Sequence, residues 1–416
     1  MDLFIPPTVP RRQPPHPHRR AAINEKEEEE EEERNTGQQI EYCLRRCKRR
    51  KSSTTNIESS SSSLPDDAWY EILSHLPAQK IYDMARLVCW KWYRMIYTHT
   101  FIYANLQHTP YGLLFGDRDG ETFFMTMQQG QIETSNLSYG FSSPYWSTCN
   151  GLTLEMAGAL GSVYHVINPL TKQVFVLPPA PRIVFWFCGI GYTPVSMEYK
   201  AVTTSLELDS KDAWLILTIG VDSSWRVVRT DHFRCLARML SMGSPFITEG
   251  FMHWAGCSNR TQRKVWNQVL SLDVETEILT KSCVPFEYGG YDDHWTYLST
   301  GKFLTVLITC GECLWEVWEM KSGEWRKMDG VIIDLGTKMF ELFGFEIVPV
   351  GWLNDLEVLV FRVISYIDVR PFTDVRSYIF VYNLLTKETS VFELPNVSLL
   401  HNPVLHKNSL VWLAGC

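Results

Sequence analysis

The sequence predicts a multidomain fold in which a short helical unit is followed by an all-β body. Residues 1–63 consist of like-charge and low-complexity blocks, and residues 64–101 place apolar side chains at helical spacing. After residue 101, short β-branched or aromatic runs alternate with turn clusters. Because 45% of the 416 residues are hydrophobic and fifteen are Trp, most of the chain is expected to fold.

Residues 1–63 are predicted to form a disordered tail. They contain the acidic run Glu27–Glu33, the basic cluster Arg45–Lys51 and the serine run Ser59–Ser63. Such blocks cannot bury a core. Arg45–Lys51 holds six cations in seven residues, which fits a nuclear import signal or an RNA-binding patch, and equally a solvated tail that balances the acidic run.

Charge and cysteine usage limit the class of partner. Residues 1–63 carry 12 Lys and Arg against 11 Asp and Glu, and the rest carries 27 against 36, so the acidic body is not expected to bind nucleic acid. No apolar run reaches about 18 residues and Met1–Pro10 lacks an apolar core, so neither a membrane span nor a signal peptide is expected. The eleven Cys are then reduced thiols, in the nucleus and/or cytoplasm.

The segment LPDDAWYEILSHLPAQKIYDMARLVCWKWYRMIYTHTF (64–101) predicts three short helices. Asp66 and Asp67 are expected to cap the first helix, and Pro77 ends it. Its apolar face comprises Ala68, Ile72, Leu73 and Leu76. The second and third helices are expected at Gln79–Leu87 and Val88–Tyr97. Fewer than ~40 residues cannot cover so many aromatic side chains internally, so part of this surface should be covered by a partner.

This segment resembles the F-box, whose pattern is roughly LPxDLLxxILxxLP…LxxVCKxWxxLI. One departure is Trp90, where a Lys or Arg is usual. The resemblance implies an F-box at 64–106 that binds a Skp-family adaptor, which in turn joins the chain to a cullin and a RING subunit. The implied contact residues are Leu64, Pro65, Asp66, Ile72, Leu73, Leu76, Pro77, Val88, Cys89 and Trp92.

The β body contains a repeat. VINPLTKQVFVLP (166–178), SLDVETEILTKSCVP (271–285) and VYNLLTKETSVFELP (381–395) each place Asn or Asp after an apolar strand and Thr three residues later. The Asn or Asp should hydrogen-bond its own backbone two residues on. Anchors at Gly116, Asn168, Gly220, Asp273, Glu319 and Asn383 are spaced by 52, 52, 53, 46 and 64 residues. Six units of this length predict a β-propeller with kelch-length blades.

Residues 107–416 resemble the kelch-like or F-box-associated domains of plant F-box proteins, in which STCNGL (147–152) and VINPLTK (166–172) recur. A strict kelch repeat is not matched, because kelch blades usually each carry a Gly-Gly pair and only Gly289-Gly290 is present. The resemblance implies that the propeller binds a target protein.

No catalytic, cofactor or metal site is predicted. The chain lacks a G-x-S-x-G elbow, an H-E-x-x-H motif and a phosphate-binding loop. Cys310 and Cys313 form a lone C-x-x-C pair, and nothing in the sequence brings His253 and Cys257 to it, whereas a zinc site needs four converging ligands.

The loop Phe286–Trp295 is the candidate target-binding site. It sets aromatic side chains beside charged ones, the mixture found at protein interfaces. The alternative is a connecting loop whose aromatic residues pack inward. The candidate residues are Tyr288, Tyr291, Asp292, His294 and Trp295. A second candidate is Tyr139–Cys149.

Together these features predict a non-catalytic substrate-recognition subunit of an SCF-type (Skp–cullin–F-box) ubiquitin ligase, which promotes ubiquitination and degradation of a target protein. A non-degradative Skp-binding adaptor or scaffold would share every one of these features. A β-propeller enzyme is the third possibility, since fold alone does not exclude catalysis.

Overall fold

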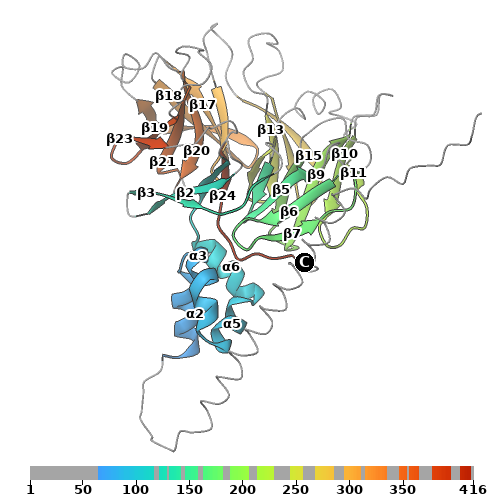
Figure 1. Cartoon of the computed structure of the whole chain (residues 1–416). Coiled ribbons are helices and arrows are strands. Elements are labelled where there is room, and N and C mark those ends of the chain that lie inside the picture. The colour runs from blue at the N-terminus through green and yellow to red at the C-terminus, as the bar shows by residue number, and fades with distance from the viewer. Residues whose placement is uncertain are drawn as a thin grey trace, which may run out of the picture. The chain divides into compact units, whose positions relative to one another are not determined.

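The computed structural model (Figure 1) describes the chain from residue 64 onward, with gaps. The described residues are 64–116, 121–128, 131–141, 146–157, 163–180, 188–205, 213–228, 244–255, 268–284, 295–310, 314–334, 346–353, 356–364, 377–394 and 403–413. The chain divides into two units, Met1–Leu64 and Pro65–Cys416, and the second contains all of the helices and strands described below. The predicted tail and its basic cluster Arg45–Lys51 lie outside the described residues.

The predicted helical segments are confirmed, and one more helix follows them. The helices are α2 (Asp66–Ser74), α3 (Ala78–Lys80), the π-helical turn η1 (Ile81–Ala85), α4 (Arg86–Val88), α5 (Trp90–Ile96) and α6 (His99–His108). The run α3–η1–α4 is the predicted second segment. Helix α6 was not predicted, and it extends two residues past the predicted domain junction at residue 106. It is stabilised by packing, because Phe101, Ile102 and Leu106 are buried in the core.

The helix ends differ from the prediction in one respect. The residue before α2 is Pro65, and no side chain caps that helix. Asp66 and Asp67 lie in its first turn, where their charges are favourable to the helix dipole, so they act there and not as caps. Helix α5 is capped by Cys89, whose Sγ accepts a hydrogen bond from the Trp92 N–H at 3.5 Å.

The strands form six four-stranded antiparallel sheets in the described part of the chain, which confirms the six-bladed propeller (Figure 1). Blade 1 contains β24 (Val404–His406), β1 (Gly112–Gly116), β2 (Thr122–Gln128) and β3 (Gln131–Asn136). Blade 2 contains β4 (Trp146–Cys149), β5 (Leu152–Ala157), β6 (Val163–Asn168) and β7 (Gln173–Val176). Blade 3 contains β8 (Cys188–Thr193), β9 (Glu198–Ser205), β10 (Ala213–Thr218) and β11 (Arg226–Val228).

The remaining strands complete the ring of blades. Blade 4 contains β12 (Phe246–Thr248), β13 (Phe251–Ala255), β14 (Gln268–Asp273) and β15 (Leu279–Cys283). Blade 5 contains β16 (Trp295–Ser299), β17 (Leu304–Thr309), β18 (Leu314–Lys321) and β19 (Glu324–Asp334). Blade 6 contains β20 (Glu346–Leu353), β21 (Val358–Ile364), β22 (Ser377–Asn383) and β23 (Thr389–Leu394). Among the described residues, no helix is long and apolar enough to cross a membrane.

The first and last strands of the chain share blade 1. Strand β24 pairs with β1, with Gly112 opposite His406 and Leu114 opposite Val404. The C-terminal region therefore closes the ring of blades. This closure corrects one of the predicted repeat anchors. Gly116 ends β1, which is the second strand of its sheet, whereas each of the other anchors lies near the end of the third strand of its own sheet. A second correction concerns Glu319, which lies inside β18 because the turn follows at Ser322 and Gly323.

The predicted Asn and Asp turns are confirmed in three blades. Asn168 Oδ1 accepts from the backbone N–H of Leu170 at 3.0 Å and of Thr171 at 3.2 Å. Asp273 and Asn383 accept in the same way from the second and third residues after them. Each turn then places a residue in the left-handed region, namely Lys172, Glu277 and Lys387 at φ 60°, 59° and 61°.

Aromatic and aliphatic side chains fill the spaces between blades. Trp352 of β20 is 1% exposed and donates through Nε1 to Thr305 Oγ1 of β17 at 2.9 Å, which joins blades 5 and 6. Trp214 of blade 3 and Trp254 of blade 4 pack with ring centroids 4.2 Å apart. The high Trp content thus serves the packing of neighbouring blades.

Candidate functional site

The helical segment exposes large apolar side chains at positions that the sequence predicts for partner binding. Leu64 is 47% exposed, Ile72 46% and Val88 61%. Pro65, Asp66, Pro77 and Cys89 are also exposed. Large apolar side chains left exposed on one short segment fit an interaction surface. These exposed residues of the helical segment are called the docking surface below.

Two of the predicted contact residues are partly buried, and one is fully buried. Leu73 is 1% exposed and belongs to the core, so its assignment to the docking surface is corrected. Neighbouring residues of a helix point about 100° apart, which is why Leu73 turns inward while Ile72 faces solvent. Leu76 and Trp92 are half-buried against the same core. Trp92 packs against Trp69, with ring centroids 5.0 Å apart.

Further exposed apolar side chains of the helical segment were not among the predicted contact residues. Met84, Leu87 and Trp90 are each more than half exposed. Trp90 stacks on Tyr93, with centroids 5.3 Å apart and planes 10° from parallel, and Tyr93 packs against Tyr97. Spacings of three and four residues bring these rings together on α5. The departure at Trp90 from the usual Lys or Arg could have indicated this aromatic row.

One ion pair lies within the docking surface. The Lys91 ammonium pairs with the Asp66 carboxylate, which connects α5 to the first turn of α2. Both side chains are exposed, so the pair contributes little to stability. It does place a positive charge beside Asp66, so this carboxylate is not a lone charge on the surface.

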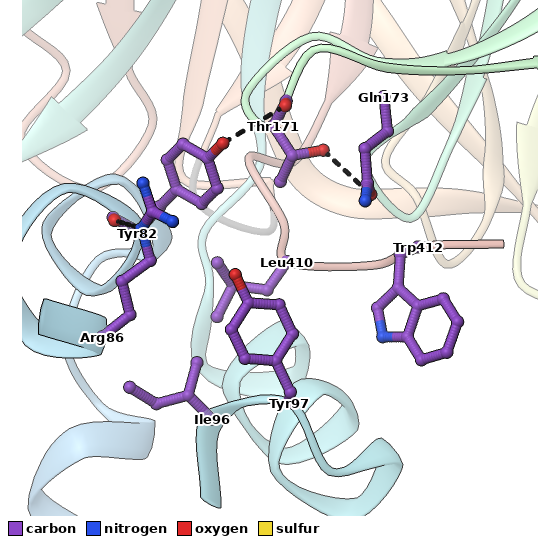
Figure 2. A pocket seen from close by; sticks show the side chains of 8 residues that line it. All are labelled: Tyr82, Arg86, Ile96, Tyr97, Thr171, Gln173, Leu410 and Trp412. Atoms are coloured by element: carbon purple, nitrogen blue, oxygen red, sulfur yellow. Dashed lines mark hydrogen bonds between the residues drawn. The ribbon is translucent and has the colours of Figure 1, made fainter. Parts of the chain in front are cut away.

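The helical segment contacts the propeller at blade 2 (Figure 2). Tyr82 Oη donates to the Thr171 carbonyl at 3.3 Å, so a helix residue bonds to the turn that Asn168 begins. Buried side chains of the helices and of blades 2 and 3 form one continuous core. A cavity of about 60 Å³ remains at this contact. It is lined by Tyr82, Arg86, Ile96, Tyr97, Thr171, Gln173, Leu410 and Trp412.

The candidate target-binding loop is described at one of its five predicted residues. Tyr288, Tyr291, Asp292 and His294 lie outside the described residues. Trp295 begins β16 and is 9% exposed, within a cluster that includes Tyr297 and Met320. Trp295 is therefore not on an exposed rim, which agrees for that residue with the alternative of inward packing, and its assignment to a target-binding site stays a prediction. In the second candidate, Cys149 is buried and Tyr139 packs edge-on against Phe141.

The described residues contain no group of three or more potential metal ligands. His253, considered above beside Cys257, is buried in β13, where its Nε2 lies 2.8 Å from Thr248 Oγ1 and its Nδ1 2.7 Å from Ser271 Oγ. Burial lowers the pKa of His253 to about 3, so the ring is neutral. Cys313 and Cys257 lie outside the described residues.

The described chain thus combines a short helical unit that exposes apolar side chains with a six-bladed propeller. Residues 61–107 match the model of the F-box-like domain, and residues 113–411 match the model of the F-box associated beta propeller domain. The chain therefore belongs to the family of F-box proteins that carry an F-box associated β-propeller domain.

Two curated proteins that this chain resembles are F-box proteins of a plant. The putative F-box only protein 15 of Arabidopsis thaliana is 25% identical over 236 residues, which is 53% of this chain and 59% of that protein. A second putative F-box protein of Arabidopsis thaliana is 27% identical over 238 residues, which is 52% of this chain and 58% of that protein. The alignments thus span somewhat more than half the length of each relative.

One solved structure that this chain resembles is a distant neighbour. The periplasmic gluconolactonase of Pseudomonas aeruginosa is 12% identical, with 72% of this chain and 99% of that protein covered, at a TM-score of 0.36. So low a score supports no conclusion about this chain. The family membership rests instead on the two domain matches, which together cover most of residues 61–411.

Proposed function

We propose that this chain binds a Skp-family adaptor through its F-box and a target protein through its propeller, and so directs ubiquitination of that target. The observation that carries the proposal is the exposure of Leu64, Ile72 and Val88 at F-box positions. The neighbouring Leu73 and Ile96 are buried and hold the helices together. The chain thus separates core residues from residues left for a partner.

The energetics favour an apolar partner groove. Burying a Leu, Ile or Val side chain contributes about 1.5–3 kcal/mol relative to leaving it in water. Ordering and desolvation oppose this gain, so only part of it appears as affinity. Because Lys91 pairs with Asp66, docking need not desolvate an unpaired carboxylate at this surface.

The proposed mechanism is proximity. A target held on the propeller, with the F-box anchored in the ligase, presents its lysines near an activated ubiquitin thioester at high effective concentration. No catalytic group of this chain takes part in that step. The cullin and RING subunits would be reached through the adaptor.

Affinity capture of the intact protein tests the proposal. The Leu64→Ala, Pro65→Ala double variant should lose the Skp-family adaptor and cullin that the wild type recovers. A Leu385→Ala variant serves as the matched control, because Leu385 is 75% exposed on blade 6 and should leave capture unchanged. The proposal is wrong if the wild type recovers neither adaptor nor cullin.

Turnover of the co-captured proteins tests the degradative part separately. A target that is destabilised by the wild type and stabilised by the double variant supports degradation. A target whose half-life is the same with both proteins supports a non-degradative adaptor instead, while leaving adaptor binding in place.

A further inference from the structure

After β24 the chain leaves the propeller sheet and runs along blade 2. We call residues 407–413 of this stretch the strap. Asn168 holds it, since Nδ2 donates to the carbonyl of Ser409 at 2.9 Å and to that of Val411 at 2.7 Å. Asn168 is 1% exposed, so these are buried hydrogen bonds. A side chain far earlier in the chain thus fixes the backbone of the C-terminal region.

The other recurring motif of blade 2 contacts the same strap. Gly151, in STCNGL, has φ +85°, and a Cβ there would lie 2.0 Å from Ser409 Oγ and 2.8 Å from the Lys407 carbonyl. Only glycine permits so close an approach in this conformation. STCNGL and VINPLTK therefore supply two sides of one binding site for the strap.

The strap in turn contacts the F-box region. Lys407 Nζ donates to the carbonyl of Leu106 in α6 at 3.2 Å, and the ammonium lies 4.3 Å from the centre of the Tyr111 ring. A cation at the end of a helix also favours the helix dipole. Leu410 is buried in the core cluster that includes Ile96 of α5.

Figure 2 shows the strap between the two parts that it joins. Leu410 and Trp412 lie between Tyr97 of the F-box region and Gln173 of blade 2. The Tyr82 hydroxyl bonds to the Thr171 carbonyl beside them. The turn that begins at Asn168 therefore contacts the helices both directly and through the strap.

The equivalent turns show that the amide of Asn168 is not needed for the turn itself. Asp273 occupies the same position in blade 4 and accepts the same two backbone hydrogen bonds with a carboxylate. Among the described residues, the side chains of Asp273 and Asn383 bond to their own turns alone. In Asn168, Oδ1 therefore makes the hydrogen bonds of the turn, and Nδ2 donates to the strap.

We propose that Asn168 is a positioning residue, which fixes the orientation of the F-box relative to the propeller by gripping the strap. The consequence for ubiquitin transfer rests on the proposed function, whereas the grip itself does not. In the ligase, this grip sets which lysines of a bound target face the thioester.

The Asn168→Asp variant tests the grip, because it keeps the turn acceptor and removes the donor. Asn383→Asp is the matched control, since in the described part of the chain that side chain bonds only to its own turn. Spin labels on unnatural amino acids at Arg94 and Val221 report the distance between the F-box and the propeller. We expect the distance distribution of Asn168→Asp to broaden about twofold, since weakly joined domains move independently. Its melting temperature should fall by several degrees, because two buried carbonyls lose their donor. The control should match the wild type.

A distribution for Asn168→Asp as narrow as that of the wild type would overturn the proposal. Should Asn168→Asp fail to fold, Lys407→Met replaces it, because Lys407 bonds α6 from a half-buried part of the strap. A distribution as narrow as that of the wild type in that variant would also overturn the proposal. The folded variant should bind a Skp-family adaptor with the same affinity as the wild type. It should change which lysines of a bound target are modified. If the wild type binds no adaptor, the proposed function fails while the distance result still decides the grip.

Discussion

The guanidinium of Arg226 donates two hydrogen bonds of 2.8 Å to the carboxylate of Glu277, and the two residues belong to different blades. Arg226 lies in β11 of blade 3, and Glu277 lies in the turn before β15 of blade 4. Lys200 of β9 adds a third bond to the same carboxylate at 2.9 Å. This network joins two strands of blade 3 to a turn of blade 4.

Glu277 should make the stability depend on acid pH. The hydrogen bonds from Arg226, followed by Lys200, lower the pKa of Glu277 to about 2 from 4.5. The stabilisation is therefore present above pH 4.5 and is lost as the pH falls from 4.5 towards 2. Glu277→Gln should cost about 1–2 kcal/mol at pH 7, because a charge-assisted network in partial contact with water is lost. Urea unfolding of the wild type and of Glu277→Gln at pH 6 and pH 3.5 measures this difference. An equal loss of unfolding free energy in both proteins on acidification would contradict the prediction.

His253 should add a second pH dependence at a higher pH. Its burial lowers the folded-state pKa to about 3 from 6.5, so protons bind the unfolded chain more readily. The free energy of unfolding should fall as the pH drops below 6.5, and His253→Gln should weaken that fall. Two-dimensional NMR of the ring provides the direct check. A His253 ring that titrates near pH 6 in the folded protein contradicts the assignment.

Asn105 should stabilise the F-box through its amide. Nδ2 donates to the carbonyls of Ser74 at 2.9 Å and Leu76 at 2.8 Å, at the C-terminal end of α2. Asn105→Ala leaves these carbonyls without their buried donor and should cost about 1–3 kcal/mol. Hydrogen exchange of the α2 amides should accelerate, while exchange in blade 5 stays unchanged. Unaltered exchange in α2 would show that the amide is dispensable.

Trp352 and Thr305 should be energetically coupled. Thr305→Val removes the acceptor of a buried indole N–H, which should cost about 1–3 kcal/mol. Trp352→Phe removes the donor and leaves a cavity. Because both variants lose the same hydrogen bond, the double variant should be less destabilised than the sum of the single ones. A double-mutant cycle by urea unfolding measures this coupling, and strict additivity would contradict it.

The repeat could be predicted from the sequence because the turn chemistry is local. The side chains of Asn168, Asp273 and Asn383 each bond to backbone groups two and three residues later, so each turn is recognisable from a few neighbouring residues. The distances in sequence between these turns then give the spacing of the blades. The closure of the ring could not be predicted in this way. Pairing of β24 with β1 joins the two ends of the β body, and no local pattern at Gly116 shows that its sheet takes its first strand from the C-terminal region.

The docking surface could be predicted in outline but not residue by residue. The F-box pattern identifies positions, whereas burial decides which of them face a partner. Ile72 and Leu73 are adjacent apolar residues on a short helix, and only the packing against α6 separates them. Helix α6 itself was missed because its aromatic and β-branched residues favour strands locally, and tertiary packing overrides that preference.

Direct binding of a purified Skp-family adaptor tests the central claim. By titration calorimetry, the wild type should bind, and Val88→Asp should bind at least about tenfold more weakly, because the carboxylate must be desolvated in an apolar groove. Val195→Asp, at a side chain that is 81% exposed on a propeller turn, should bind like the wild type. Absence of binding by the wild type, or equal affinity of Val88→Asp and the wild type, would contradict the account.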